Sequence, residues 1–169
     1  MIRKLGKKRP KIASSAFVSE SAYIVGGVEI GENSSIWPGA VLRADRFRIK
    51  IGRNCSIQDN CVVHAGLSDL IIGNNVTIGH GSVIHCAKIG DNVLVGMHTA
   101  LMNFSEIGDF SIIGTHSMVI DNFKVPARSL AIGVPATIKR RLKSKEINRI
   151  ISASETYMEL SREFKRQGL

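Results

Sequence analysis

The sequence predicts an all-β protein, a parallel β-helix of about six triangular coils followed by a C-terminal α-helix. Three observations predict this class. A branched aliphatic residue returns every six positions from Val18 to Val125, small residues usually follow four places later, and helical spacing of apolar residues begins only after Ser144. Because 44% of the 169 residues are hydrophobic, the chain can bury a sizeable core.

The six-residue repeat is the strongest of these observations. Of the seventeen steps between its eighteen anchors, fourteen are six residues long; the steps 42 to 51 and 63 to 72 are longer, and the step 84 to 89 is shorter. A period of six fits neither a helix nor an ordinary strand, and it indicates short strands joined by bends, with coils stacked about 4.8 Å apart. The anchors are Val18, Ile24, Ile30, Ile36, Leu42, Ile51, Ile57, Val63, Ile72, Ile78, Ile84, Ile89, Val95, Leu101, Ile107, Ile113, Val119 and Val125.

The pattern divides the chain into three expected segments. These are a basic N-terminal segment at 1–11, a β-helix domain at 12–133, and a linker with an α-helix at 134–169. Stacked coils need caps at their ends, and Ser144 can cap the N-terminus of the last segment's helix. We expect this helix to pack along the prism or across a subunit boundary.

The net charge of +9 lies at the two ends of the chain. Residues 1–11 hold six Lys or Arg and residues 139–169 hold nine against four acids, whereas residues 12–138 hold eight basic and ten acidic residues. The middle therefore has no basic face for phosphates, and we expect no nucleic-acid partner.

Three cysteines without a paired framework indicate a reducing compartment, and we expect a cytoplasmic protein. Cys55 and Cys61 fall among the small corner residues and are expected to pack in the core, whereas Cys86 adjoins His85 and could either pack or oxidise. No apolar run approaches the roughly 20 residues of a membrane span, and the N-terminus has no secretory h-region, so no membrane contact is expected.

Stacking converts sequence position into spatial neighbourhood. The residues directly after the anchors of the second face include Arg43, His64 and His85, so the two histidines are expected one coil apart, near 5 Å between backbones. Two imidazoles at that separation can share a metal ion. Both long steps of the repeat leave this same face, and loops beside a rigid scaffold are where sites tend to be built.

A third histidine, His80, is expected around the corner of the same coil, directly above Asp59. From one chain it should not converge with the other two, but from a neighbouring chain it could, which favours a site shared between subunits of a cyclic trimer. The alternative is that all three are surface corner residues. His98 and His116 form another stacked pair without a third partner, and we interpret them as corner residues.

Several segments resemble the γ-class carbonic anhydrase-like family of the hexapeptide-repeat superfamily. The resemblance extends from about Ile12 into the terminal helix, and the spaced histidines make it specific. The matching segments are residues 42–45 (Leu-Arg-Ala-Asp), 57–64 (Ile-Gln-Asp-Asn-Cys-Val-Val-His), 78–85 (Ile-Gly-His-Gly-Ser-Val-Ile-His), 95–97 (Val-Gly-Met) and 126–136.

This resemblance implies a left-handed β-helix and a homotrimer with one metal per subunit interface, bound by His64, His80 and His85. The implied metal is zinc, with iron or cobalt as alternatives, since imidazole ligands alone do not choose among them. It further implies that Arg43 and Asp59 pair across the interface and that Gln58 holds the metal-bound solvent or bicarbonate. The implied activity is reversible hydration of CO₂ by a metal-bound hydroxide.

Two departures from the family pattern concern proton export. Arg46 stands where active members carry an acidic residue, and the loop 65–70 is short with a single carboxylate, so turnover could be weak. Three alternatives stay open: a metal-dependent acyl-CoA thioesterase, which the resemblance of residues 154–160 to relatives in phenylacetate and carnitine metabolism favours; a hexapeptide-repeat acyltransferase, which needs no metal triad; and a non-catalytic accessory subunit.

Overall fold

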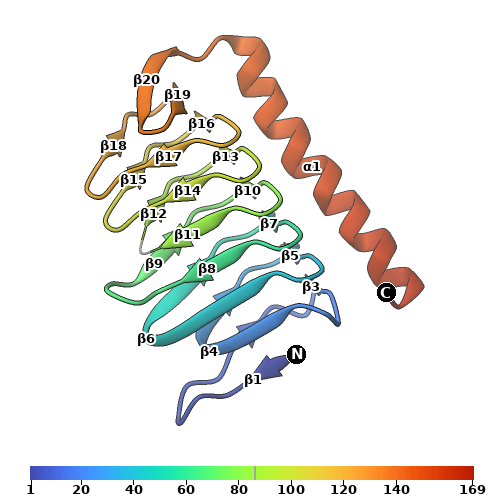
Figure 1. The fold of residues 1–169 in the computed structure, drawn as a ribbon. Coiled ribbons are helices and arrows are strands. Elements are labelled where there is room, and N and C mark those ends of the chain that lie inside the picture. Colours follow the sequence, from blue (N-terminus) through green and yellow to red (C-terminus); the bar gives the residue numbers. More distant parts are fainter. Residues whose placement is uncertain (86) are drawn as a thin grey trace.

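The computed structural model describes residues 1–85 and 87–169, and it is a parallel β-helix with one α-helix at its side (Figure 1). The predicted class, a left-handed parallel β-helix with a C-terminal helix, is confirmed. Seven strands stack in parallel on the first face, so the helix has about seven turns, one more than the anchors predict. Cys86, for which the sequence left packing or oxidation open, lies outside the described residues.

The first face is a sheet of eight strands. Its last strand turns back and pairs antiparallel with the one before it, which closes this end of the stack. The strands are β3 (Phe17–Val18), β5 (Ser35–Ile36), β7 (Ser56–Ile57), β10 (Thr77–Ile78), β13 (Leu94–Val95), β16 (Ile112–Ile113), β19 (Ser129–Gly133) and β20 (Ala136–Arg141).

The second and third faces form one continuous twelve-stranded sheet, because β4 (Tyr23–Ile30) and β6 (Val41–Ile51) run around the corner between them without a break. The second face continues with β8 (Val62–His64), β11 (Val83–His85), β14 (Ala100–Leu101) and β17 (Met118–Val119). The third continues with β9 (Leu70–Ile72), β12 (Lys88–Ile89), β15 (Glu106–Ile107) and β18 (Lys124–Val125).

The basic N-terminal segment is part of this sheet. Its strands β1 (Ile2–Arg3) and β2 (Lys11–Ile12) pair with the two halves of β4, one on each side of the corner. The first coil is therefore covered at its open edge by the segment that carries six of the basic residues.

The repeat builds the core by pointing one aliphatic side chain per strand into the prism. Every anchor except the half-buried Val18 is at most 4% exposed. Each such side chain contributes roughly 1.5–3 kcal/mol of transfer free energy, so the stacked column of Ile, Val and Leu is the main source of stability. The predicted packing role of Cys55 and Cys61 is confirmed, since both are buried free thiols.

Asparagines stabilise the corner between the third and first faces. Asn33, Asn54, Asn75 and Asn92 all adopt positive φ angles of 55° or 56°, a conformation that Asn tolerates better than most residues. Their side-chain amides form a ladder, with N–O distances of 3.2, 3.0 and 3.1 Å from one coil to the next. The asparagine side chains thus hydrogen-bond to one another across four successive coils.

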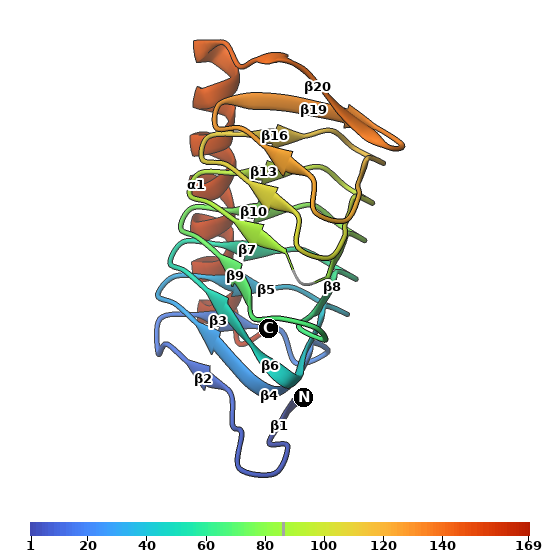
Figure 2. The same ribbon diagram turned by 90° about the vertical axis from the view of Figure 1, so that its left-hand side faces the viewer.

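The helix α1 (Ser144–Gln167) lies along the first face and contacts β3, β5, β7 and β10 (Figures 1 and 2). Buried Ile150 anchors it, and the Ser154 hydroxyl donates to the Asn54 carbonyl at 2.8 Å. Phe17 and Trp37 of the β-helix pack against Tyr157 and Phe164 of the helix, with ring centroids 5.1 to 5.9 Å apart. The first face is therefore covered within the chain.

The start of the helix differs by one residue from the sequence prediction. Lys143, rather than Ser144, is the N-cap. The Glu146 carboxylate accepts the Lys143 backbone N–H at 2.9 Å and pairs with the Arg140 guanidinium at 2.7 Å, so a capping carboxylate replaces the expected serine hydroxyl.

Candidate metal centre

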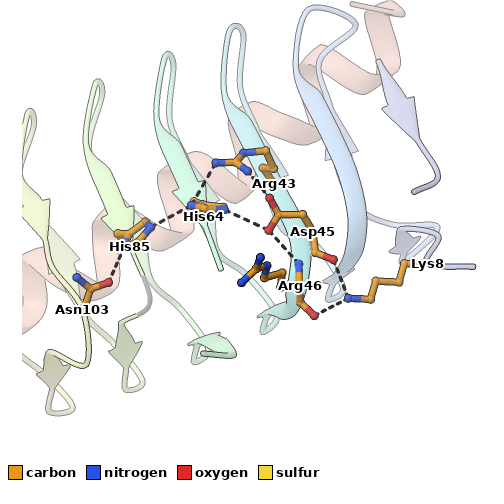
Figure 3. Close-up of polar contacts among 7 residues, drawn as sticks. All are labelled: Lys8, Arg43, Asp45, Arg46, His64, His85 and Asn103. Carbon is orange, nitrogen blue, oxygen red and sulfur yellow. Dashed lines mark hydrogen bonds and ion pairs between the residues drawn. The ribbon is translucent and has the colours of Figure 1, made fainter. Parts of the chain in front are cut away.

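The strands β8 and β11 bring His64 and His85 together on the second face. The two residues are register partners in adjacent parallel strands, as the six-residue arithmetic predicts. Their ring centroids are 4.9 Å apart, and His64 Nδ1 lies 3.0 Å from His85 Nε2 (Figure 3). Two nitrogen atoms from coils 21 residues apart therefore face each other.

The opposite nitrogen of each ring has its own acceptor. His64 Nε2 lies 3.3 Å from Asp45 Oδ1, and His85 Nδ1 lies 2.7 Å from Asn103 Oδ1. Flipping the Asn103 amide would remove the hydrogen bond that its Nδ2 donates to Asp121 Oδ1 at 3.3 Å. With the ring N–H groups directed at Asp45 and Asn103, the two facing nitrogens carry lone pairs, and the Arg43 guanidinium lies 3.3 Å from the one on His64.

Asp45 is held in its ionised form beside His64. Its burial acts to raise the pKa, but the Arg46 backbone N–H, the hydrogen bond from His64 and the Arg43 charge outweigh that effect, and the pKa is lowered. The Arg43 guanidinium contacts Asp45 Oδ2 and also lies 3.3 Å from His64 Nδ1. In this chain Arg43 thus pairs with Asp45, whereas the resemblance implies a pair with Asp59 of a neighbouring chain.

Gly66 packs closely against the two facing histidines. A Cβ atom added at Gly66 would lie 2.7 Å from His64 Cε1, 3.2 Å from His64 Nδ1 and 3.3 Å from His85 Nε2. A contact of 2.7 Å is closer than real Cβ atoms come, so any other residue here would move the ring. The short loop after β8 therefore approaches the histidines with a residue that occupies no side-chain space.

The other predicted site residues lie around the corner, between β7 and β11. His80 Nδ1 is 2.8 Å from Asp59 Oδ2, and the His80 backbone N–H donates to Gln58 Oε1 at 3.1 Å. Gln58 is only 4% exposed, and its side chain also hydrogen-bonds to Tyr157 of α1. The Gln58 side chain is therefore engaged within the chain, rather than turned to solvent.

Within one copy of residues 1–85 and 87–169, no group of three or more His, Cys, Asp or Glu side chains is arranged to hold a metal ion. His98 and His116 are exposed corner residues with positive φ angles of 53° and 56°, and their rings stack 5.1 Å apart.

Sequence reasoning missed Asp45, Asn103 and Gly66 as parts of the site. Asp45 and Gly66 each follow a histidine-column residue by two positions, in the first residues of the two long steps. Asn103 follows Met102, the next member of that column. Reading the residues beside the column, and not only the column itself, would have singled them out.

The second face is also the apolar face of the molecule. Val62 and Val83, which directly precede the buried anchors of β8 and β11, are 39% and 43% exposed, and Ile120, directly after β17, is 42% exposed. Such a patch of large apolar side chains around two histidines is typical of a surface that another protein covers. Among the residues described, no helical segment is both long and apolar enough to traverse a bilayer.

Comparison with known proteins agrees with this architecture. Residues 9–44 match the family model "Bacterial transferase hexapeptide (six repeats)", and residues 69–101 match "Hexapeptide repeat of succinyl-transferase". A hexapeptide transferase family protein from Anaplasma phagocytophilum superposes with a TM-score of 0.94 at 36% identity, covering 96% of this chain and 97% of the other. An N-acyltransferase from Bacillus cereus is alike in fold alone, with a TM-score of 0.71 at 16% identity over 91% and 90% of the two chains.

Two further relatives are named as carbonic anhydrases. The "Probable carbonic anhydrase" of Methanocaldococcus jannaschii is 44% identical over 152 residues, which are 89% of this chain and 95% of that protein. "Gamma carbonic anhydrase 2, mitochondrial" of Arabidopsis thaliana is 35% identical over 162 residues, 91% of this chain, and this chain spans 58% of its length. The chain belongs to the γ-class carbonic anhydrase-like family of hexapeptide-repeat proteins.

Proposed function

We propose that this protein is a metal-dependent enzyme that interconverts CO₂ and bicarbonate, with its metal held between subunits by His64 and His85 of one copy and His80 of the next. One observation carries the proposal: His64 Nδ1 and His85 Nε2 face each other at 3.0 Å, and the other ring nitrogen of each histidine faces an oxygen acceptor. Two imidazole nitrogens at that distance share a proton or lie on either side of a cation, and a metal ion bound there would take the place of the Arg43 guanidinium, which lies 3.3 Å from His64 Nδ1.

The surroundings fit a divalent cation. Metal-bound histidines usually donate their second N–H to a carboxylate or an amide oxygen, which is the role that Asp45 and Asn103 have here. His80 follows the same pattern, because its Nδ1 faces the Asp59 carboxylate and its Nε2 remains as a ligand. Gly66 keeps side-chain atoms out of the space beside both facing nitrogens. We propose zinc, with iron or cobalt as alternatives, since imidazoles suit all three.

A bound divalent metal would supply Lewis acidity that brings the pKa of a water molecule towards neutrality. The residues of this chain set the conditions for that chemistry. Three neutral imidazoles leave the full positive charge in place, whereas Asp45 and Asn103 orient two of the rings. Arg43, next to His64, provides a cation that favours bicarbonate over CO₂ at the site's edge.

Proton export is the weak part of this site. The Asp69 carboxylate, the one acid of the loop after β8, accepts the Arg48 backbone N–H at 2.8 Å and pairs with its guanidinium at 3.4 Å. Arg46 occupies the position of an acidic residue in the family pattern. Because neither is suited to carry a proton to solvent, we propose slow turnover.

The proposed assembly is a homotrimer in which the apolar second face of one copy is covered by the corner of the next. The exposed fractions of Val62 and Val83 support it, since side chains of this size are costly to leave in water. We also propose a reducing compartment such as the cytoplasm, because Cys55 and Cys61 are free and buried, with pKa values raised by burial to about 12 and about 11.

An acyl-transfer or thioester-hydrolysis activity is the second candidate, favoured by the transferase names of structures that share this fold. Metal content and substrate separate the candidates. Protein purified without added zinc or chelator should contain about one metal per subunit and accelerate CO₂ hydration in a stopped-flow assay, while His80→Ala should lose the metal. Thioester hydrolysis without CO₂ hydration, or unchanged metal content in His80→Ala, would contradict the proposal.

A further inference from the structure

The basic N-terminal segment has no part in the proposed reaction, yet it reaches the histidine site. Between β1 and β2, residues 5–8 form a turn that is closed by two backbone hydrogen bonds between Leu5 and Lys8, of 2.9 and 3.0 Å. Because β1 and β2 are fixed to the two halves of β4, this turn is held at the corner between the second and third faces. β4 and β6 both pass around the same corner.

Lys8 crosses β4 and binds the backbone of β6. Its path passes over Gly27, where an added Cβ would lie 3.6 Å from Lys8 Cδ. The Lys8 ammonium donates to the carbonyl oxygens of Asp45, at 2.8 Å, and of Arg46, at 2.5 Å (Figure 3). Lys8 thus links the N-terminal segment to the two residues at which β6 turns the corner.

Asp45 connects Lys8 to His64: its backbone carbonyl accepts from Lys8, and its side chain contacts the His64 ring. Asp45 Oδ1 accepts the Arg46 backbone N–H at 2.9 Å and faces His64 Nε2 at 3.3 Å. The order of contacts is therefore Lys8, the peptide groups of residues 45 and 46, the Asp45 carboxylate, and the His64 ring. A shift of the peptide groups by a few tenths of an ångström would lengthen a hydrogen bond that is already 3.3 Å.

We propose that Lys8 is a positioning residue for the metal centre: it fixes the corner at residues 45 and 46 so that Asp45 selects the His64 tautomer with its proton on Nε2 and its lone pair on Nδ1. The proposal rests on the proposed function only in assigning Nδ1 to a metal. The tautomer itself is a property of the metal-free protein. The N-terminal segment thereby acquires a role other than binding a polyanion.

The chain offers matched variants for the test. Lys8→Met keeps the aliphatic stem and removes the donor, while Lys8→Arg keeps a cationic donor. Lys7→Met removes a neighbouring charge that forms no hydrogen bond or ion pair with any residue that the structure describes, so it controls for net charge. Asp45→Asn removes the carboxylate itself.

Two readouts are needed: the His64 tautomer from nitrogen-15 chemical shifts of the metal-free protein, and zinc affinity from a competition titration. Lys8→Met should show a mixture of the two tautomers and bind zinc about threefold to tenfold more weakly, somewhat less than the loss typical of direct partners of a ligand. Lys8→Arg and Lys7→Met should match the parent protein in both.

Two results would overturn the role of Lys8. One is a Lys8→Met variant with the parent tautomer and affinity, when Asp45→Asn alters both. The other is an equal loss in Lys7→Met, which would mean that net charge and not the contact with β6 matters. The proposed function fails differently: His64→Ala would retain zinc, while the tautomer measurement on Lys8→Met would still be valid.

Discussion

The second and third faces are built on the same inward repeat and differ only in what they turn outward. On both, a buried aliphatic anchor recurs in every coil, from Ile24 to Val119 on one and from Ile30 to Val125 on the other. The residue preceding the anchor is Val62 or Val83 on the second face, whereas on the third it is Ile71 in one coil and Lys88, Glu106 or Lys124 in the next three. The inward repeat therefore determines the fold, and the outward columns determine which face can carry a site.

The two faces also differ in the polarity of the side chains that they expose to solvent. The third face offsets its charges with ion pairs between coils, at 3.8 Å for Lys11 and Glu29 and 3.0 Å for Glu106 and Lys124. The second face exposes branched apolar side chains around His64 and His85. The charged third face is suited to water, whereas the apolar side chains of the second face are suited to the interface proposed above.

The largest expected effect comes from placing a charge on each face in turn. Val83 and Ile71 hold equivalent places before their anchors and are 43% and 41% exposed. Val83→Glu should dissociate the proposed trimer and abolish metal binding, because a carboxylate desolvated at an apolar interface costs several kcal/mol. Ile71→Glu should remain trimeric in light scattering. Equal behaviour of the two variants would refute the assignment of the second face as the interface.

A smaller effect is expected from a substitution at Gly66, which packs against the histidines. Gly66→Ala should weaken zinc binding by about tenfold or more, because its Cβ would displace the His64 ring from 2.7 Å contact. Gly27→Ala is the control, since a Cβ there meets its nearest atom at an ordinary 3.5 Å. A competition titration measures the zinc affinity of both variants. Unchanged affinity in Gly66→Ala would show that the close approach of Gly66 has no part in the site.

On the third face, removal of an ion pair should matter little. Glu106→Gln breaks a pair whose side chains are 47% and 71% exposed, so the free energy of unfolding should fall by less than about 0.5 kcal/mol, and less still in high salt. Denaturant unfolding checks this. A loss of several kcal/mol would mean that the charged face, too, is buried in the assembly.

The smallest effect concerns acid stability at the start of α1. Hydrogen bonding from Arg140 and from the Lys143 backbone lowers the pKa of Glu146 to about 2. A lowered pKa means that this carboxylate stabilises the fold above about pH 4.5, and that the contribution is lost as the pH falls towards 2. Glu146→Gln should flatten thermal stability across that window. Glu155→Gln, which removes an acid from the same helix, serves as the control.

Much of this comparison was predictable from the sequence, because period and column position are properties of the chain alone. The anchors gave the coils, and the coils placed His64 beside His85 although 21 residues separate them. The other contacts of the site depend on where long side chains extend, which the repeat does not determine. Nothing in the spacing says that Lys8 crosses a coil to bind residues 45 and 46, or that Tyr157 of the terminal helix contacts Gln58.

The central claim, a metal site shared between subunits, can be tested by mixing two defective chains. His64→Ala and His80→Ala should each form trimers that bind no metal. In a cyclic trimer that contains both chains, one interface joins an intact His64 and His85 to an intact His80, so co-expressed protein should recover about one metal per mixed trimer. Recovery of metal and of CO₂ hydration is the predicted result; mixed trimers as empty as their parents would contradict it.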